Sequence, residues 1–276
     1  MNTITAAITA VGGYVPDYVL TNQILETMME TNDEWITSRT GIKERRILKD
    51  KDKGTSFLAI EAAKDLLRKS NTDPKDIDLI IMATATPDMP VSATGVFVAT
   101  EIGAVNAFSF DLAAACSSFI FGMSTAARYI ESGKYKKVLL IGADKMSSII
   151  DYTDRTTCII FGDGAGAVLI TKSDQPGILS SHLHANGSHY NTLSLPGKIS
   201  HGKIQGNPFV TMEGNTVFKF AVKVMEEIVY EALSENNLQI SDIDWLIPHQ
   251  ANIRIIRSTA KKLGIPMEKV VTTIAK

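Results

Sequence analysis

Short apolar runs of strand length alternate along this chain with longer amphipathic segments. The strand-like runs are 77–85, 108–114, 137–144, 158–170 and 243–249. Between them, apolar residues recur at helical spacing in the segments 56–70, 117–133 and 217–235. Strands that alternate with helices predict an α/β fold in which helices cover a largely buried sheet.

One motif occurs twice and indicates an internal duplication. The residues 76–78 (Asp-Ile-Asp) follow an amphipathic segment and precede an apolar run, and 242–244 repeat these letters in the same context 166 residues later. We therefore expect two related α/β halves, 1–173 and 174–276, that meet at the polar stretch KSDQPG. Only 32 residues follow the second motif, so we expect the second half to be truncated.

The composition excludes several classes of protein. With 276 residues and a formal net charge of −2, the chain has no overall attraction to nucleic acid or to an anionic membrane. Its two cysteines form no CxxC pair, which argues against a disulfide framework or structural zinc and fits a reducing cytoplasm. The N-terminal segment lacks a basic region and is interrupted by Gly12, Gly13 and Pro16, so we predict a strand and turn and not a signal peptide. No apolar run approaches the ~18 residues of a transmembrane helix.

Cys116 stands where the run 108–114 ends and a helical segment begins. Unpaired backbone N–H groups and the helix dipole favour an anion there, so we expect a lowered thiol pKa and donors for an oxyanion. The alternative is a cysteine that fills the core. Cys158 has branched and apolar neighbours, and we interpret it as a packing residue.

His249 ends the run 243–249 in the other expected half and precedes the helical segment 251–264. We expect it to face the same cleft as Cys116, where an imidazole exchanges a proton or donates a hydrogen bond to an oxyanion. A structural histidine is the alternative.

Two other features of the sequence are not interpreted as ligand-binding sites. The remaining histidines lie in a Gly/Ser/Asn-rich region without acidic or cysteine ligands, so no metal site is predicted; they are His182, His184, His189 and His201. The glycines of 162–170 lack the Lys-Ser/Thr of a phosphate loop and lead into a strand, which predicts a tight turn beside the active cleft.

Four segments together resemble the 3-oxoacyl-[acyl-carrier-protein] synthase III family, the initiating condensing enzymes of type II fatty-acid synthesis. They are AACSSF around Cys116, PHQANIRI at 248–255, FGDGAGA at 161–167 and DEWITSRTGIKERR at 33–46. The resemblance implies a thiolase-like fold, with two duplicated α/β halves in a layered α-β-α-β-α arrangement. It also implies that an acyl-CoA acylates Cys116, that malonyl-acyl carrier protein then loses carbon dioxide, and that His249 stabilises the enolate that attacks the acyl group.

The same resemblance implies binding residues, position by position. For CoA and its pantetheine arm they are Thr31, Trp35, Arg39, Arg155, Met212, Gly214, Phe218 and Asn252. For the acidic acyl carrier protein they are Gln250, Ala251, Asn252, Ile253 and Arg254, with Lys219, Lys261 and Lys262 in one basic patch. From the residues alone, a buried tryptophan, a surface ion pair and a solvated basic helix face remain the alternatives.

Met89 matches a family position that reaches into the acyl pocket of the partner subunit in a homodimer. Methionine is pliable, so we expect tolerance of longer or branched primers. No cofactor is implied. The family's catalytic asparagine and a second oxyanion donor follow the last strand predicted here, so neither is assigned. Three other functions remain open: an acyltransferase of secondary metabolism, a non-catalytic homologue that binds acyl carriers, and a cysteine hydrolase.

Overall fold

The computed structural model describes residues 5–275, which form two compact units. The first unit contains the chain up to Tyr18, Arg46–Met146 and Asp163–Leu183. The second contains Val19–Arg45, Ser147–Gly162 and the chain from His184 onward. The compact units are therefore not consecutive halves of the sequence, and the duplication boundary at residue 173 stays a prediction.

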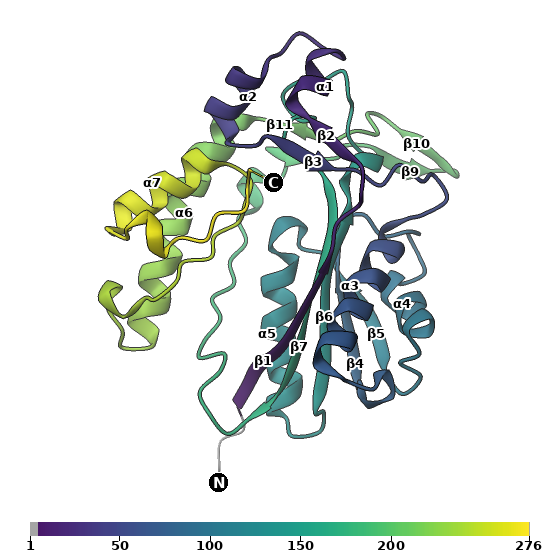
Figure 1. Ribbon diagram of the computed structural model, residues 1–276, viewed down its shortest axis with the longest axis vertical. Helices are drawn as coiled ribbons and strands as arrows, with labels where there is room; N and C mark the ends of the chain where they lie inside the picture. Colours follow the sequence, from purple (N-terminus) through teal and green to yellow (C-terminus); the bar gives the residue numbers. More distant parts are fainter. Residues whose placement is uncertain (1–4, 276) are drawn as a thin grey trace. The chain divides into compact units, whose positions relative to one another are not determined.

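A five-stranded mixed sheet forms the centre of the first unit, in the order β1-β7-β6-β4-β5 (Figure 1). Its strands are β1 (Thr5–Tyr14), β4 (Leu79–Ala83), β5 (Phe108–Leu112), β6 (Lys137–Lys145) and β7 (Asp163–Ser173). Strand β4 lies between β5 and β6 and is parallel to both, while β7 is antiparallel to β6 and to β1. Every residue of β4 is buried, as its continuous apolar sequence predicts.

Helices cover both faces of this sheet (Figure 1). The helices α3 (Thr55–Ser70) and α4 (Thr94–Ile102) contribute to the apolar cluster on one face, and α5 (Ser118–Glu131) contributes to the cluster on the other. Along β4, Ile80 and Met82 belong to the first cluster, whereas Leu79 and Ile81 belong to the second. This two-residue alternation is the pattern of a strand buried on both faces.

A close approach between β1 and α3 requires glycine at position 12. A Cβ atom on Gly12 would lie 2.5 Å from the backbone N of Leu66 and 2.6 Å from the backbone O of Ala62. Both atoms belong to the backbone of α3, which cannot rotate away as a flexible side chain would. The helix therefore lies this near the strand only because Gly12 has no side chain.

The second unit consists mainly of helices and short strand pairs. Its helices are α1 (Asn22–Glu26), α2 (Asp33–Thr40), α6 (Gly214–Glu235) and α7 (Ile253–Leu263). The strand pairs are β2 (Val19–Thr21) with β3 (Glu44–Arg46), β8 (Leu193–Ser194) with β11 (Thr211–Met212), and β9 (Lys198–Ser200) with β10 (Lys203–Gln205). The apolar side of α7 packs against Ile42, Val270 and Ile274. The other residues of α7 are polar or basic.

The two Asp-Ile-Asp motifs have the same local conformation. Each closes a 3₁₀ turn, η1 (Pro74–Asp76) or η5 (Ile240–Asp242). The next residue is extended in both, with φ and ψ of −75° and 124° at Ile77 and of −78° and 115° at Ile243. This agreement supports the expected duplication.

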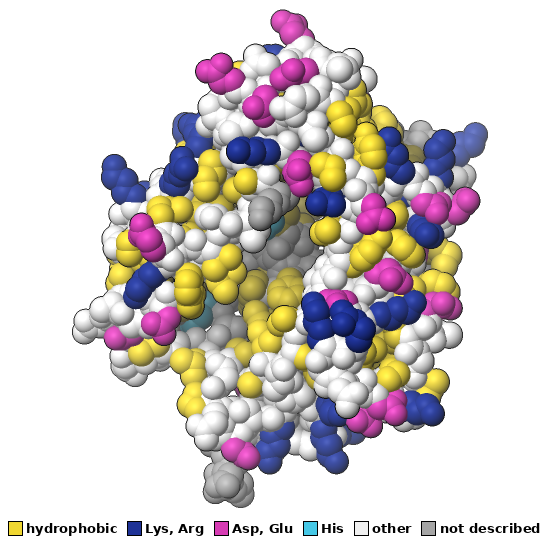
Figure 2. Space-filling model, viewed as in Figure 1, with side chains coloured by type: hydrophobic (Ala, Val, Ile, Leu, Met, Phe, Trp, Pro, Cys, Tyr) yellow, Lys and Arg dark blue, Asp and Glu magenta, His cyan; other side chains and the backbone are white. Residues whose placement is uncertain are grey.

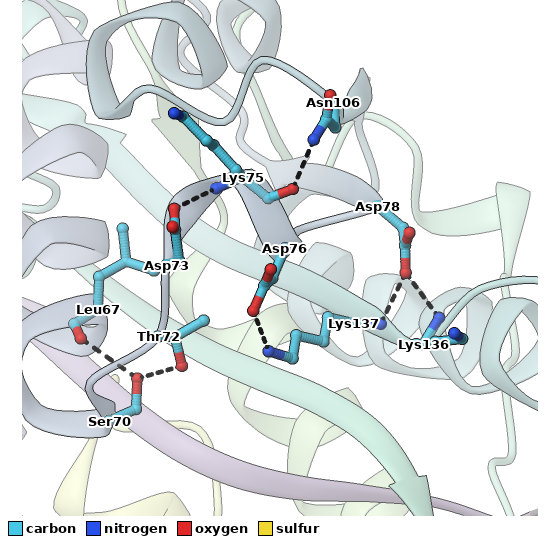
Figure 3. Close-up of polar contacts among 10 residues, drawn as sticks. All are labelled: Leu67, Ser70, Thr72, Asp73, Lys75, Asp76, Asp78, Asn106, Lys136 and Lys137. Carbon is cyan, nitrogen blue, oxygen red and sulfur yellow. Dashed lines mark hydrogen bonds and ion pairs between the residues drawn. The ribbon is translucent and has the colours of Figure 1, made fainter.

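In the first unit this motif ties the turn before β4 to the start of β6 (Figure 3). The Asp78 carboxylate accepts hydrogen bonds from the backbone N–H groups of Lys136 and Lys137, at 2.7 and 3.0 Å. Asp76 forms an ion pair with Lys137 Nζ at 2.8 Å. The carboxylates therefore help to align two neighbouring parallel strands.

Two of the predicted strands differ from the structure. In the run 158–170, strand β7 begins only at Asp163, because Cys158 N donates to Asp154 O at 3.1 Å and thereby closes a turn. Of the glycines of the expected tight turn, Gly164 and Gly166 lie within β7 itself and only Gly162 directly precedes it, so the prediction of a turn over these glycines was wrong. In the run 243–249, the described residues form only an isolated bridge between Leu246 and Val270.

Candidate functional site

Cys116 lies on a strained turn between β5 and α5, as the sequence predicts. The turn η2 (Ala115–Ser117) is preceded by Ala114, whose N–H donates to the Ser118 hydroxyl at 2.6 Å. Ala115 has a φ of 48°, a left-handed conformation that costs a residue with a side chain of order 1–3 kcal/mol. The hydrogen bond from Ala114 N helps to hold this turn, and Cys116 is exposed on it, so the thiol is accessible to a substrate.

The surroundings of Cys116 raise the pKa of its thiol, so the expected lowering by the helix was wrong. Desolvation is the largest cause, the charge of Asp144 adds to it, and the backbone N–H of Cys116 opposes both. Although the side chain is accessible, enough protein surrounds the sulfur to disfavour the thiolate. Cys116 is therefore a neutral thiol at neutral pH.

Asp144, at the C-terminal end of β6, is a residue that the sequence analysis missed. Its Oδ1 accepts hydrogen bonds from the N–H groups of Ala85 and Thr86, at 2.8 and 3.1 Å, and from the hydroxyls of Thr84 and Thr86, both at 3.0 Å. Desolvation raises the pKa of Asp144, and these hydrogen bonds oppose the rise. Asp144 thus anchors the segment that leads to Met89, whose side chain is 57% exposed. A lone acid at the end of the apolar run KVLLIGAD was the available signal.

His249 lies in an extended segment that the side chain of Gln250 holds in place. Gln250 Nε2 donates to the carbonyls of Pro248 and Val271, at 2.8 and 3.0 Å, and its Oε1 accepts from Thr273 N at 2.8 Å. Burial lowers the pKa of His249 below its ordinary value of 6.5, so the imidazole is neutral at pH 7. A neutral ring has one donor and one acceptor nitrogen. Since Cys116 and His249 belong to different units, the cleft expected to unite them stays a prediction.

Four residues expected to bind CoA lie close together in the second unit. The guanidinium carbons of Arg39 and Arg155 lie 4.9 and 5.2 Å from the centre of the Trp35 ring. Arg155 Nη1 also donates to the carbonyl of Glu30 at 3.1 Å. The hydroxyl oxygen of Thr31 is buried and has no hydrogen-bond partner among the described residues. The group therefore offers an aromatic face, two cations and an unsatisfied hydroxyl.

The other expected binding residues lie on α6, α7 and the strand before α6. Met212 ends β11, Gly214 begins α6, and the guanidinium carbon of Arg254 lies 5.2 Å from the centre of the Phe218 ring. This contact joins a residue expected for the carrier protein to one expected for pantetheine.

Several residues of the expected carrier-binding segment also serve the chain's own structure. Asn252 Oδ1 accepts from Arg254 N at 2.9 Å and caps α7, while Ile253 packs against the apolar cluster around Ile256. The side chains of Lys219 and Lys261 are exposed, and Lys262 contacts Glu226 Oε2 at 2.6 Å. Ala251 is half-buried in the segment between Gln250 and the cap.

The residues interpreted as structural have structural contacts. Cys158 is fully buried, its sulfur lies 3.4 Å from that of Met29, and its pKa is raised to about 11, chiefly by burial. His184 contacts Glu231 at 2.7 Å, and the His189 ring lies 4.4 Å from that of Phe220. Among residues 5–275, no group of three His, Cys, Asp or Glu side chains could hold a metal ion.

On the face of the molecule that Figure 2 shows, basic and acidic side chains are interspersed, and no large region carries charges of one sign only. This distribution fits the small formal net charge of −2. Over the described part of the chain, every helix is too short or too polar to span a membrane.

Comparison with known proteins identifies relatives along nearly the whole chain. The family model for 3-oxoacyl-[acyl-carrier-protein (ACP)] synthase III matches residues 110–187, and the model for its C-terminal part matches 233–276. The beta-ketoacyl-[acyl-carrier-protein] synthase III of Chlorobaculum tepidum is 49% identical over 280 residues, which cover 98% of this chain and 85% of the relative. The enzyme of the same name from Neisseria gonorrhoeae is 47% identical, with coverage of 98% and 84%.

Solved structures agree with this result. The crystal structure of 3-oxoacyl-[acyl-carrier-protein] synthase III from Aquifex aeolicus matches with a TM-score of 0.92 at 43% identity, covering 98% of this chain and 85% of that one. The priming β-ketosynthase of the R1128 polyketide pathway matches with a TM-score of 0.90 at 34% identity, with coverage of 98% and 81%. The thiolase-like fold expected from the motifs is therefore confirmed. With relatives almost half identical over 98% of its length, the chain belongs to the 3-oxoacyl-[acyl-carrier-protein] synthase III family of condensing acyltransferases.

Proposed function

We propose that this chain catalyses the initiating condensation of type II fatty-acid synthesis, with Cys116 as the residue that carries the acyl group. The sulfur attacks the carbonyl of an acyl-CoA, CoA leaves as the thiol, and an acyl-Cys116 thioester remains. Malonyl-acyl carrier protein then loses carbon dioxide, and its carbanion attacks the acyl carbonyl. The products are 3-oxoacyl-carrier protein and free Cys116. An exposed thiol on a strained turn, in a chain of this family, is the observation that carries the proposal.

His249 is the proposed proton acceptor and enolate stabiliser. Because the pKa of Cys116 is raised, the thiol must lose its proton as the sulfur attacks, and a base must accept this proton. The lowered pKa of His249 keeps one ring nitrogen free to accept it. The N–H of a neutral imidazole also suits a developing enolate oxygen, which needs a hydrogen-bond donor.

We infer that Trp35, Arg39 and Arg155 bind the nucleotide of CoA. An aromatic face stacks on adenine, and guanidinium groups both stack and neutralise phosphate charge. The unsatisfied hydroxyl of Thr31 would gain a partner from the same ligand. The pantetheine arm is assigned to Met212, Gly214, Phe218 and Asn252, and Phe218 contacts Arg254, which is proposed to bind the carrier protein.

The acyl carrier protein is the proposed partner of the α6–α7 surface. Exposed Lys219 and Lys261, with Arg254 and Lys262, give this surface a local positive charge although the whole chain is mildly acidic. An acidic partner is attracted to such a patch by long-range electrostatics. Gln250, Ala251, Asn252 and Ile253 complete the proposed docking segment.

A homodimer through strand β5 is proposed next. This strand lies at the edge of the five-stranded sheet, where unpaired backbone groups can accept a strand from a second copy. Exposed apolar side chains lie on β5 and on the segments that precede it in the chain: Val91 is 96%, Phe97 is 51% and Phe108 is 40% exposed. In this proposal Met89 enters the acyl pocket of the other subunit and tolerates longer or branched primers.

The remaining expectations stay predictions: a cytoplasmic location, the absence of a cofactor, of nucleic acid and of membrane binding, and duplicated halves of residues 1–173 and 174–276. An acyltransferase of secondary metabolism is not favoured, because identity to the polyketide ketosynthase is 34% against 49% for a synthase III. A non-catalytic homologue would need neither Cys116 nor His249.

Mass spectrometry after incubation with acetyl-CoA tests this function. One acetyl group is expected on the peptide that contains Cys116, none in the Cys116→Ala variant, and an unchanged signal in the Cys158→Ser variant. Addition of malonyl-acyl carrier protein should then release the label as 3-oxoacyl-carrier protein. Release by water without a malonyl donor would indicate a hydrolase, and no acetylation of Cys116 would contradict the proposal.

A further inference from the structure

Arg45 is a charged side chain buried in the second unit, only 3% exposed. Its Nε donates to the carbonyl of Ile159 at 2.9 Å, Nη2 donates to the same carbonyl, and Nη1 donates to Asn22 Oδ1. Burial lowers its pKa to about 10, so the guanidinium still carries its charge at neutral pH. Burial of a charge costs free energy of folding, and an apolar side chain of similar volume would often give an equally stable or more stable fold. A specific role for this arginine is therefore expected from the contacts that it forms.

One side of the Arg45 guanidinium is linked to α2, which bears Trp35. Asn22 is fully buried, and its Nδ2 donates to Asp33 Oδ1 at 2.6 Å and to the carbonyl of Ile42 at 2.9 Å. Asp33 is the first residue of α2, two residues before Trp35. Arg45 thereby fixes the N-terminal turn of this helix through Asn22.

The other side holds the turn that bears Arg155. The Asp154 carboxylate accepts from Thr156 N at 2.9 Å and from the Thr157 hydroxyl at 2.8 Å, and the backbone N–H of Cys158 closes the turn on Asp154 O at 3.1 Å. The carbonyl of Ile159, the residue after Cys158, accepts two hydrogen bonds from Arg45. Arg45 therefore holds the end of a turn that is rigid within itself.

We propose that Arg45 is a positioning residue for the nucleotide end of acyl-CoA. Its guanidinium bridges the helix that bears Trp35 and the turn that bears Arg155, and so maintains the spacing between the aromatic ring and the cation that lies 5.2 Å from it. A planar guanidinium can direct two donors at one carbonyl and a third at a second acceptor, which a lysine ammonium cannot do in the same geometry. The inference rests on the proposed role of Trp35 and Arg155 in binding CoA.

Comparison of two acyl donors tests the inference, because acetyl-pantetheine lacks the nucleotide that acetyl-CoA carries. In Arg45→Lys and Arg45→Met, we expect KM for acetyl-CoA to rise about tenfold, the effect of about 1.4 kcal/mol, with kcat within about twofold. KM for acetyl-pantetheine should stay unchanged. Arg46→Met is the matched control, since the neighbouring arginine of β3 contacts the carbonyl of Pro16 instead, and it should affect neither donor.

Trp35→Ala separates failure of the inference from failure of the proposed clamp. If Trp35→Ala leaves the preference for acetyl-CoA over acetyl-pantetheine unchanged, the clamp itself is wrong and the inference falls with it. If Trp35→Ala lowers this preference, the positioning role of Arg45 is overturned by either of two results for Arg45→Lys. One is wild-type KM values for both donors, and the other is an equal rise in KM for acetyl-CoA and for acetyl-pantetheine. Circular dichroism reports folding, and Arg45→Lys decides where Arg45→Met fails to fold. If neither variant folds, Arg45 serves stability alone and the inference is likewise overturned.

Discussion

Asp144 Oδ1 accepts hydrogen bonds from both the backbone N–H and the hydroxyl of Thr86, at 3.1 and 3.0 Å. The same oxygen accepts the N–H of Ala85, and the charge of this carboxylate is the second cause of the raised pKa of Cys116. One side chain therefore both anchors the segment before Met89 and disfavours the thiolate form of the proposed nucleophile.

Asp144→Asn should remove the charge and keep an acceptor at the position of Oδ1, because an amide oxygen also accepts hydrogen bonds, although more weakly than a carboxylate. The pKa of Cys116 should fall, and iodoacetamide should alkylate Cys116 faster at pH 8 than in the wild type. The free energy of unfolding should fall by about 1 kcal/mol, because hydrogen bonds to a neutral acceptor are weaker than those to a charged one. An unchanged or slower alkylation in a folded variant would show that the charge of Asp144 does not reach the thiol.

The rate of alkylation of Cys116 should keep rising with pH. Because desolvation raises the thiol pKa above the ordinary value of 9.0, the thiolate fraction grows about tenfold from pH 7 to pH 8 and is still rising at pH 9. This profile is measured by labelling with iodoacetamide for fixed times at each pH and counting the alkylated chains by mass spectrometry. The Cys116→Ala variant gives the background alkylation of buried Cys158. A plateau below pH 8 would instead indicate a thiolate stabilised by its surroundings.

His249 should remain neutral at pH values where an ordinary histidine is half protonated. Burial disfavours the imidazolium, so the folded-state pKa lies below 6.5 and the unfolded chain binds more protons in the window between the two values. Stability should therefore fall as the pH drops through this window, and this contribution should be missing in His249→Asn. Titration of the ring by NMR, with His249→Asn to assign its signal, checks the direction; a midpoint above 6.5 would refute it.

Gly12→Ala should destabilise the first unit, whereas Gly166→Ala should not. The added methyl group at position 12 would press on the backbone of α3, 2.5 Å from Leu66 N, and overpacking of this kind costs about 1–3 kcal/mol. At Gly166 a Cβ atom would meet nothing within 4 Å, so the change should be neutral or stabilise by up to about 1 kcal/mol. Urea unfolding compares the two variants, and equal free energies would contradict the close approach.

Charge reversal on the α6–α7 surface should impair the reaction with the carrier protein alone. In Lys219→Glu with Lys261→Glu, we expect KM for malonyl-acyl carrier protein to rise about tenfold at low salt, while acetylation of Cys116 by acetyl-CoA is unchanged. The difference should shrink as salt screens the charges. Lys51→Glu with Lys53→Glu, a matched reversal in the first unit, is the control, and an equal loss there would argue against a specific docking surface.

Local patterns in the sequence predicted many elements to within a few residues. The helical spacing of apolar residues in 56–70 and 117–133 corresponds to α3 and α5, and the continuous apolar run 77–85 contains the buried strand β4. The position of Cys116 between a strand and a helix followed in the same way. These predictions succeeded because hydrophobic periodicity is a property of neighbouring residues. The run 243–249 failed because a strand also needs a partner, which periodicity does not specify.

The sequence by itself determined the family, the order of helices and strands and the candidate residues, since each depends on letters that lie close together. Only the tertiary structure decided which distant groups meet: Arg45 with the carbonyl of Ile159, 114 residues away, and Asp144 with Thr86, 58 residues away. It also reversed the expected shift in the pKa of Cys116, because desolvation depends on all the atoms packed around the sulfur and not on its neighbours in the chain.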